Sequence, residues 1–247
     1  MDTPGATPPA RPPDVAAREW PAGWHVRVVE ETGSTNADLL AEAADGAPNR
    51  SVLAARHQTA GRGRLDRTWV APPGANLLVS LLFTEVPHVP HQLTQRVGLA
   101  AIAASTQVAG VTPSLKWPND LLVDDRKLAG ILAQSTLVAG RQAVVVGIGV
   151  NVGWAPPEGA RLGEALDPLN LLEALLTAYD ALPVDITAAY RANLGTLGRA
   201  VRVELSDGVL EGRAIDVEAD GRLVVLDACG ISHRVDTGDV VHLRAQG

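Results

Sequence analysis

The pattern of apolar and polar positions along the chain predicts short strands interspersed with longer helices. Segments that alternate, or that are apolar over the length of a strand, predict β-strands at 25–30, 52–55, 77–83, 121–123, 127–133 and 143–150. Apolar positions at helical spacing predict helices at 93–109, 168–182 and 184–194. Because strands and helices do not alternate strictly, we expect an α+β fold: a mixed, largely antiparallel sheet with helices on one face.

A further helix is expected directly behind the polar turn at 32–36. Thr35 is the expected N-cap, since its hydroxyl can accept a hydrogen bond from a free backbone N–H of the first turn. Asp38 follows three residues later and completes a capping-box pattern. Leu39 and Leu40 then supply the inward face of the helix. The polar turn is therefore expected at the N-terminal end of a helix.

The pattern changes after Gly195. Five short β segments follow, separated by Asp-Gly and Cys-Gly turns, at 199–205, 209–217, 222–226, 232–236 and 240–243. Short strands at this spacing predict a small antiparallel barrel of about fifty residues. The chain is thereby divided into a disordered Pro- and Ala-rich tail over 1–22, a large domain over 23–196 and a barrel domain over 197–247.

Composition and charge narrow the class of protein. The 21 Lys and Arg residues face 28 Asp and Glu residues, and the net charge of −7 opposes non-specific binding to nucleic acid. The single cysteine, Cys229, excludes an internal disulfide and a multi-thiolate metal site, and we expect it to be a small buried side chain. Neither a membrane span nor a secretory signal is recognisable, so a cytoplasmic protein without membrane association is expected.

The segment 58–69, QTAGRGRLDRTW, is the densest candidate for chemistry. Its glycines allow backbone N–H groups to approach a ligand, and its three arginines can bind carboxylate or phosphate oxygens. A small anion is the ligand that this composition favours. A solvated basic loop without a ligand is the alternative for any Gly-Arg repeat. The spacing is neither that of a phosphate-binding GxxxxGK[ST] loop nor that of GxGxxG.

Four other segments carry polar side chains at the ends of predicted elements. In 116–120, KWPND, Asn119 and Asp120 follow a proline-fixed turn and could face a pocket or make structural turn bonds. Lys127 begins an apolar strand in which Gly130 lacks a side chain; the lysine could extend along the strand edge to solvent or place a charge in a cleft.

The segments 34–36, STN, and 147–151, GIGVN, complete the candidate chemistry. Hydroxyl and amide groups at a helix N-terminus suit a neutral polar group such as a urea, with N-capping as a partial alternative account. In the second segment, glycines remove side chains from a buried strand that ends on Asn151. The Asn151 amide could hydrogen-bond to an amide or to the edge of a base. A structural bulge is the alternative explanation of these glycines. The six histidines show no metal-binding spacing.

Taken in order, these segments resemble the biotin protein ligase family over roughly 28–243, and the Gly-Arg loop with KWPND is highly specific to it. The resemblance implies a class II synthetase-like fold, the biotin–lipoate ligase fold, with a C-terminal SH3-like barrel. The family's bifunctional members carry an N-terminal DNA-binding domain. The sequence before Trp24 offers no room for one, so the chain resembles a monofunctional ligase and DNA is not an expected partner.

The reaction that the resemblance implies has two steps. Biotin and MgATP give biotinyl-5'-AMP and pyrophosphate, and a lysine of a biotin carboxyl carrier domain of acetyl-CoA carboxylase then takes the biotinyl group. The catalytic residues implied are Arg64, Lys127 and Asp120. Those implied for biotin are Ser34, Thr35, Asn36, Gln58, Gly61, Arg62, Gly63, Arg64, Lys127, Gly130 and Gly149. Those implied for ATP and the adenylate are Arg62, Arg64, Arg67, Trp69, Asn119, Lys127 and Asn151.

Details of these roles also come from the resemblance. Trp69 is expected to stack on adenine and Asn151 to hydrogen-bond to it, with the Gly-Arg loop closing as a lid. Mg²⁺ is expected to arrive with ATP, and Asp120 is the one candidate protein ligand. Family members often carry glycine where this chain has Asp66, a carboxylate that could pair with Arg67.

Two alternatives remain beside the ligase. A lipoate or octanoate protein ligase shares the fold but is not expected to carry the Gly-Arg-Gly-Arg loop. A nucleic-acid-binding module could use the loop arginines on phosphates, although the acidic net charge opposes it. Both a monomer and a homodimer are compatible with the sequence.

Overall fold

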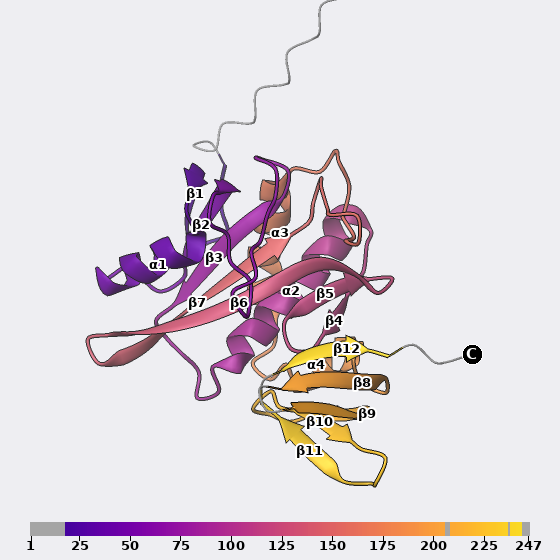
Figure 1. The fold of residues 1–247 in the computed structure, drawn as a ribbon. Coiled ribbons are helices and arrows are strands. Elements are labelled where there is room, and N and C mark those ends of the chain that lie inside the picture. The colour runs from indigo at the N-terminus through magenta and orange to yellow at the C-terminus, as the bar shows by residue number, and fades with distance from the viewer. Residues whose placement is uncertain (1–17, 206–207, 237, 244–247) are drawn as a thin grey trace, which may run out of the picture.

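The computed structural model describes residues 18–205, 208–236 and 238–243, which form two sheets with four helices (Figure 1). The first sheet contains β1 (His25–Thr32), β2 (Ser51–Gln58), β3 (Leu77–Phe83), β4 (Ser114–Lys116), β5 (Asp120–Val123), β6 (Arg126–Val138) and β7 (Arg141–Val150). The helices are α1 (Thr35–Ala44), α2 (His91–Ala109), α3 (Pro168–Ala181) and α4 (Thr187–Asn193). Most of the expected N-terminal tail lies outside the described residues.

The large sheet confirms the predicted mixed, largely antiparallel architecture. Its strand order is β1-β2-β3-β7-β6-β5-β4, and only the β1–β2 pair is parallel. The expectation of helices on one face was wrong, because α1 covers the face opposite to α2 and α3 (Figure 1). Along β3, Leu81 and Phe83 belong to the core under α2 and α3, whereas Leu82 packs with α1. All seven residues of β3 are buried, as a strand covered on both faces requires.

The start of α1 differs from the predicted capping box. Ser34, not Thr35, is the N-cap residue, and its side chain makes no capping hydrogen bond. The carboxylate of Asp38 instead accepts a hydrogen bond from the Thr32 hydroxyl. Thr35 lies in the first turn, where its backbone N–H and its hydroxyl both donate to Gln58 Oε1, at 2.8 and 3.0 Å. A side chain of β2 therefore supplies the first-turn acceptor that the sequence pattern assigned to a local cap.

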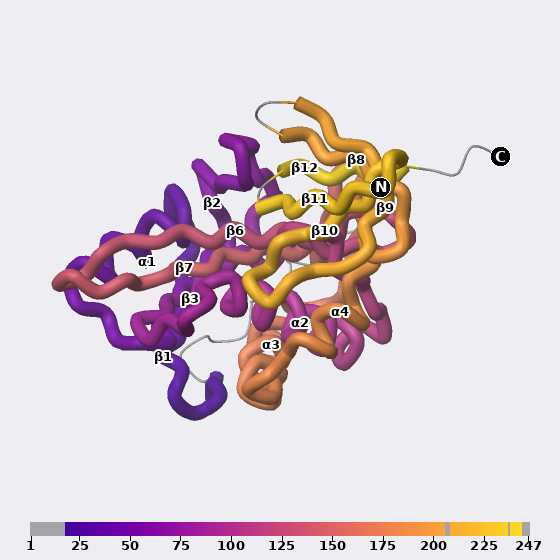
Figure 2. The backbone as a smooth tube through the Cα atoms, turned by 90° about the horizontal axis from the view of Figure 1, so that it is seen from below, coloured from indigo at the N-terminus to yellow at the C-terminus, as the bar shows by residue number. Residues whose placement is uncertain are grey.

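The second sheet lies next to α4 and the β4 edge of the first (Figure 1), and Figure 2 views the molecule from that side. Its order is β11-β10-β9-β8-β12 and all its pairs are antiparallel, consistent with a small SH3-like domain. The strands are β8 (Ala200–Leu205), β9 (Gly208–Val217), β10 (Leu223–Leu226), β11 (Ser232–Val235) and β12 (Asp239–His242). Part of the predicted Ser206-Asp207-Gly208 turn lies outside the described residues.

Cys229 corrects a second expectation, because it is exposed rather than buried. It lies in the turn between β10 and β11, where its backbone N–H donates to the Asp227 carboxylate at 2.9 Å. The same carboxylate accepts from the backbone of Ile231. Asp227 therefore holds the turn, and the cysteine side chain is left exposed.

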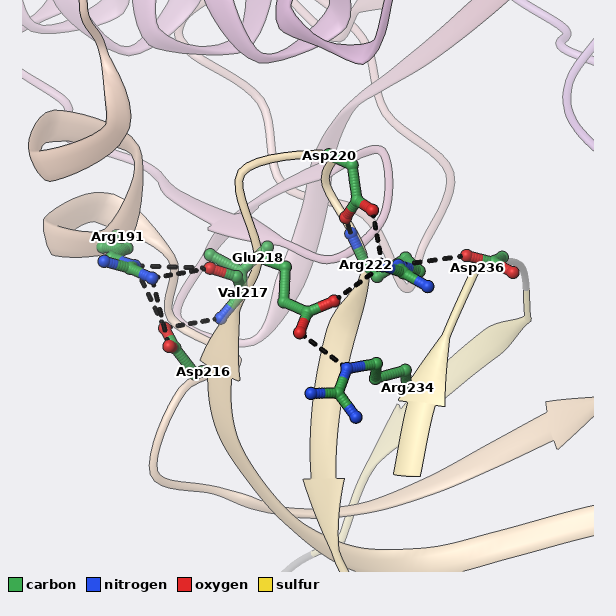
Figure 3. Close-up of polar contacts among 8 residues, drawn as sticks. All are labelled: Arg191, Asp216, Val217, Glu218, Asp220, Arg222, Arg234 and Asp236. Atoms are coloured by element: carbon green, nitrogen blue, oxygen red, sulfur yellow. Dashed lines mark hydrogen bonds and ion pairs between the residues drawn. The ribbon is translucent and has the colours of Figure 1, made fainter. Parts of the chain in front are cut away.

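Side-chain contacts fix the second sheet against the first. Trp117 Nε1 donates to the carbonyl oxygen of Gly221 at 2.8 Å. On α4, Arg191 donates to the Asp216 carboxylate at 3.0 Å and to the Val217 carbonyl at 2.9 Å (Figure 3). In the same view Glu218 is ion-paired with Arg222 and Arg234, and these two pairs lie within the C-terminal part itself.

The last residues of the expected N-terminal tail contact α3 through side-chain hydrogen bonds. Residue Arg18 donates to Asp167 and Glu173, both at 3.0 Å, at the start of α3. Trp24 is buried and donates to Asp180 from the indole. Within the described ranges, no helix combines the length and the apolar character needed to cross a membrane.

Candidate active site

The residues expected to carry the chemistry surround one cavity of about 380 Å³. It opens beside the Gly-Arg loop and is walled by the N-terminus of α1 and by β6 and β7. Its lining includes Ser34, Thr35, Asn36, Gln58, Arg62, Gly63, Arg64, Arg67, Trp69, Asn119, Asp120, Lys127, Gly130, Gly149 and Asn151. Gly61 lies behind this wall and is buried; a Cβ there would come within 2.5 Å of the Trp69 carbonyl oxygen. Segments that lie far apart in the sequence therefore line the same cavity.

The inner end of the cavity is a buried network of neutral polar groups. Ser80 Oγ donates towards Thr35 Oγ1 at 2.7 Å and Asn36 Oδ1 at 2.6 Å. Asn36 Nδ2 donates to Gln134 Oε1 at 2.9 Å and to the Leu132 carbonyl at 3.1 Å. Buried polar groups are stable only when they are paired in this way. The network therefore fixes donors and acceptors in position for a neutral, hydrogen-bonding ligand group.

Two glycines of β7, two residues apart, make room for the side chains of this site. A Cβ at Gly147 would lie 2.1 Å from Asn36 Oδ1, and one at Gly149 would lie 2.5 Å from Trp69 Cε2. The Trp69 ring thus lies flat against a strand surface from which side chains are missing. The strand is thinned at its glycines as expected from the sequence, and at Gly149 the indole of Trp69 is the group that approaches.

The Gly-Arg loop, residues 61–69, folds back on itself as a short hairpin. Gly63 N–H donates to the Arg67 carbonyl at 2.6 Å, and Trp69 N–H donates to the Gly61 carbonyl at 3.0 Å. At its tip Asp66 has a φ of 56°, in the left-handed region where glycine is preferred. The glycine common in the family at this position therefore suits the backbone. Arg67 pairs with Asp239, and no ion pair joins it to Asp66.

Arg64 is the most enclosed cation of the loop. Its Nη1 lies 3.2 Å from Asn119 Oδ1, and Asn119 is itself held by donating to the Ile131 carbonyl at 2.8 Å. Partial burial lowers the pKa of the Arg64 guanidinium, which nevertheless stays charged at any physiological pH. A partly desolvated cation interacts strongly with an incoming anion, because less water screens it. Arg62, in contrast, is exposed at the mouth of the cavity.

Lys127 places the second cation on the opposite wall. Its Nζ lies 2.7 Å from Asp120 Oδ1 and 5.7 Å from the centroid of the Trp69 ring. The ion pair and the aromatic face together hold the ammonium group in the cavity. Of the two interpretations open from the sequence, a charge placed in a cleft is therefore the one observed.

Asn151 is held by the protein itself. Its Nδ2 donates to the carbonyls of Lys127 at 3.2 Å and Ala160 at 3.1 Å, and its Oδ1 accepts from Asn76 Nδ2 at 3.3 Å. A bond from this amide to adenine stays a prediction and requires an exchange of partners. The observed bonds make Asn151 a support for the backbone of Lys127.

Several residues of the site were not expected from the sequence. Ser80 and Asn76 lie behind the wall, and Trp154, Glu158 and Asp239 line the cavity. Ser80 could have been recognised from the sequence, since it is the one polar residue within the apolar segment 77–83. Across the described ranges, no three His, Cys, Asp or Glu side chains are grouped so that they could hold a metal ion.

Two family models and several known proteins match the chain. The model of the Biotin/lipoate A/B protein ligase family matches residues 28–151, and that of the biotin protein ligase C terminal domain matches residues 196–243. The biotin-[acetyl-CoA-carboxylase] ligase of Mycobacterium tuberculosis is 41% identical over 250 residues, which cover 90% of this chain and 91% of that protein. The chain belongs to the biotin protein ligase family.

Other family members show the same relation. The biotin-[acetyl-CoA-carboxylase] ligase of Paracoccus denitrificans is 36% identical over 191 residues, covering 70% of this chain and 75% of that protein. The biotin protein ligase from Aquifex aeolicus, solved in complex with biotin and ATP, shares the fold with a TM-score of 0.72 at 24% identity, over 90% of this chain and 99% of that one. Both parts of the chain thus have counterparts within the biotin protein ligase family.

Proposed function

We propose that the chain is a biotin-[acetyl-CoA-carboxylase] ligase, which forms biotinyl-5'-AMP from biotin and MgATP and transfers biotin to a carrier-domain lysine. The observation that carries the proposal is the cavity itself. It joins a neutral hydrogen-bonding network at one end to the cations Arg64 and Lys127 at the other. Biotin has a matching arrangement of groups, with a neutral ureido ring at one end and an anionic carboxylate at the other.

In the first step the biotin carboxylate attacks the α-phosphorus of ATP, a P–O bond forms, and pyrophosphate leaves with the electrons of the broken P–O bond. Both reactants are anions, so catalysis consists mainly of positioning and charge neutralisation. Arg64 and Lys127 face the cavity from opposite walls and supply the two charges. Arg62 at the mouth is available to the leaving phosphates, and Arg67 could join it by exchanging its partner Asp239. Removing water from the closed cavity strengthens each of these interactions.

In the second step the ε-amine of the carrier lysine attacks the mixed anhydride, and AMP leaves. The attacking amine must lose a proton, and Asp120 is the carboxylate in the cavity nearest to Lys127. We assign Asp120 to orienting the incoming lysine and accepting its proton. Its ion pair with Lys127 holds the carboxylate in the cavity.

Magnesium fits this proposal as a companion of the nucleotide. Asp120 is already paired with Lys127, and the chain offers no cage of carboxylates in the described residues. Mg²⁺ keeps most of its water and phosphate ligands in such sites and there neutralises phosphate charge.

The reaction consumes ATP and the chain has a single cysteine, so we place the enzyme in the reducing cytoplasm, with a biotin carboxyl carrier domain as its protein partner.

The proposal is tested by following both steps with the purified chain. Biotin with MgATP should yield biotinyl-5'-AMP and pyrophosphate, and addition of a biotin carboxyl carrier domain should give one biotin per acceptor lysine by mass spectrometry. A carrier domain with that lysine changed to arginine is the matched control. Adenylate formation from lipoate or octanoate but not from biotin would favour the lipoate ligase alternative and contradict the proposal.

Ser80→Ala tests the network at the inner end of the cavity. The substitution leaves Thr35 Oγ1 and Asn36 Oδ1 without their shared partner, so the KM for biotin should rise about tenfold while kcat changes less than about threefold. Ser105→Ala is the matched control, because Ser105 is an equally buried serine on α2, away from the cavity. Equal changes in the KM values for biotin and ATP would contradict a role limited to the biotin end.

A further inference from the structure

The Gly-Arg loop is held by the C-terminal sheet as well as by its own hairpin. Arg67 forms an ion pair with Asp239, the first residue of β12. Arg64 Nη1 lies 3.3 Å from the carbonyl oxygen of Gly238, the residue before it. Both acceptors come from one end of β12, about 170 positions away along the chain. The C-terminal sheet therefore reaches the mouth of the cavity, and Asp239 is part of its lining.

The two arginines are linked within the loop. Gly63 N–H donates to the Arg67 carbonyl, and Arg67 N–H donates to the Arg64 carbonyl at 3.2 Å. Arg64 and Arg67 are thus the ends of one turn. A contact that fixes Arg67 also limits where Arg64 can lie. The hydrogen bond with Asp239 raises the pKa of Arg67, in keeping with a carboxylate directed at its guanidinium.

The position of Asp239 does not depend on the loop. The strand β12 pairs along its length with β8. The second sheet is fixed to the first through Trp117 and Gly221, and through Arg191 and Asp216 at its other corner (Figure 3). A loop that swings away from the cavity must therefore break its ion pair with Asp239, because the carboxylate cannot follow.

We propose that Asp239 is a positioning residue that holds the Gly-Arg loop closed over the cavity, and that the C-terminal sheet thereby slows escape of the adenylate. The contact is suited to opening as well as closing. The Arg67 side chain is 61% exposed and that of Asp239 28%, and ion pairs with such exposure are weak and reversible. The loop can therefore open to admit substrates when this ion pair breaks. The identity of the retained molecule rests on the proposed function, whereas the contact on the loop does not.

The experiment compares amide hydrogen exchange in the ligand-free protein with Asp239→Asn. The amides of Gly63, Arg67 and Trp69 are bonded within the loop, and their exchange should be about tenfold faster in the variant, because the closed loop has lost its charged partner. Glu218→Gln is the matched control: it removes a carboxylate that pairs with Arg222 and Arg234 inside the C-terminal part and touches neither the loop nor α4. It should leave exchange in 61–69 unchanged.

A charge exchange separates positioning from a general loss of structure. The double variant Arg67→Asp with Asp239→Arg restores an ion pair with opposite polarity, so exchange in the loop should return to within about threefold of the parent. Loop exchange that is the same in Asp239→Asn and the parent would overturn the proposal. So would faster exchange that spreads equally over β8 and β9, because that would mean that Asp239 serves only the fold of the C-terminal sheet.

The second readout is retention of the intermediate. Biotinyl-5'-AMP formed on the enzyme should be released about tenfold faster from Asp239→Asn than from Glu218→Gln, with a smaller change in the rate of its formation. Equal release from the two variants would overturn the role in retention. If no adenylate forms on the parent enzyme, the proposed function fails while the exchange experiment still tests the contact itself.

Discussion

Lys127→Ala should reduce the rate of biotinyl-5'-AMP formation about 100- to 1,000-fold, the usual cost of removing one preorganised charged group from a site that stabilises a transition state. The loss has two causes here. The ammonium group that offsets the repulsion between carboxylate and phosphate is gone. In addition, Asp120 loses its partner at 2.7 Å and leaves a bare negative charge in the cavity. Biotin-dependent exchange of labelled pyrophosphate into ATP, at saturating substrates, measures this step directly.

The chain offers a matched control for this prediction, since its other lysine is Lys116. Lys116 ends β4 and is absent from the lining of the cavity. Lys116→Ala should therefore retain the parental rate within about threefold. A Lys127→Ala enzyme that is equally active would remove charge neutralisation from the mechanism.

Gly149→Ala should weaken biotin binding by up to about 100-fold, because an extra methyl group in a packed site costs about 1–3 kcal/mol. The added Cβ would lie 2.5 Å from Trp69 Cε2 and 2.8 Å from Nε1, closer than atoms can approach. The indole must then move off the strand and into the space that the substrate needs. Isothermal titration of the variant with biotin, with and without a nonhydrolysable ATP analogue, measures the effect.

Two further variants test the steric origin of this loss. Gly33→Ala is the matched control, since a Cβ at Gly33 meets no atom within 4 Å, and its affinity for biotin should be unchanged. Trp69→Phe combined with Gly149→Ala should bind biotin better than Gly149→Ala alone, because the smaller ring leaves room for the methyl group. A double variant with no recovery would show that Gly149 acts otherwise than by making room for the indole.

The sequence predicted those elements whose burial follows a simple period. The segment 77–83 is apolar throughout and became a strand buried on both faces, and the predicted strands of both sheets have counterparts in the structure. The three-residue strand β4 was missed, because so short a segment carries no recognisable period. Cys229 was expected to be buried from its residue type alone, but its position in a turn decides its exposure.

The candidate site was predictable as far as it consists of contiguous segments. The Gly-Arg loop, KWPND and the segment beginning at Lys127 each carry an unusual local composition, and all three line the same cavity. The prediction of a capping box at Thr35 was wrong, because Gln58 of β2 supplies the hydrogen-bond acceptor that the pattern assigned to a local side chain. The ion pair between Arg67 and Asp239 was beyond prediction, since each residue has the composition of an ordinary surface charge and only the packing of two sheets brings them together.

The segment KWPND has its two ends in different surroundings. Trp117 is anchored on the second sheet through Gly221, and Asn119, two residues later, holds Arg64 inside the cavity. A tilt of the C-terminal sheet is therefore transmitted to the substrate pocket over a distance of two residues. Neither part of the molecule can open without disturbing the other. Heat or denaturant acting on the C-terminal sheet would thus inactivate the enzyme before the seven-stranded sheet itself had unfolded.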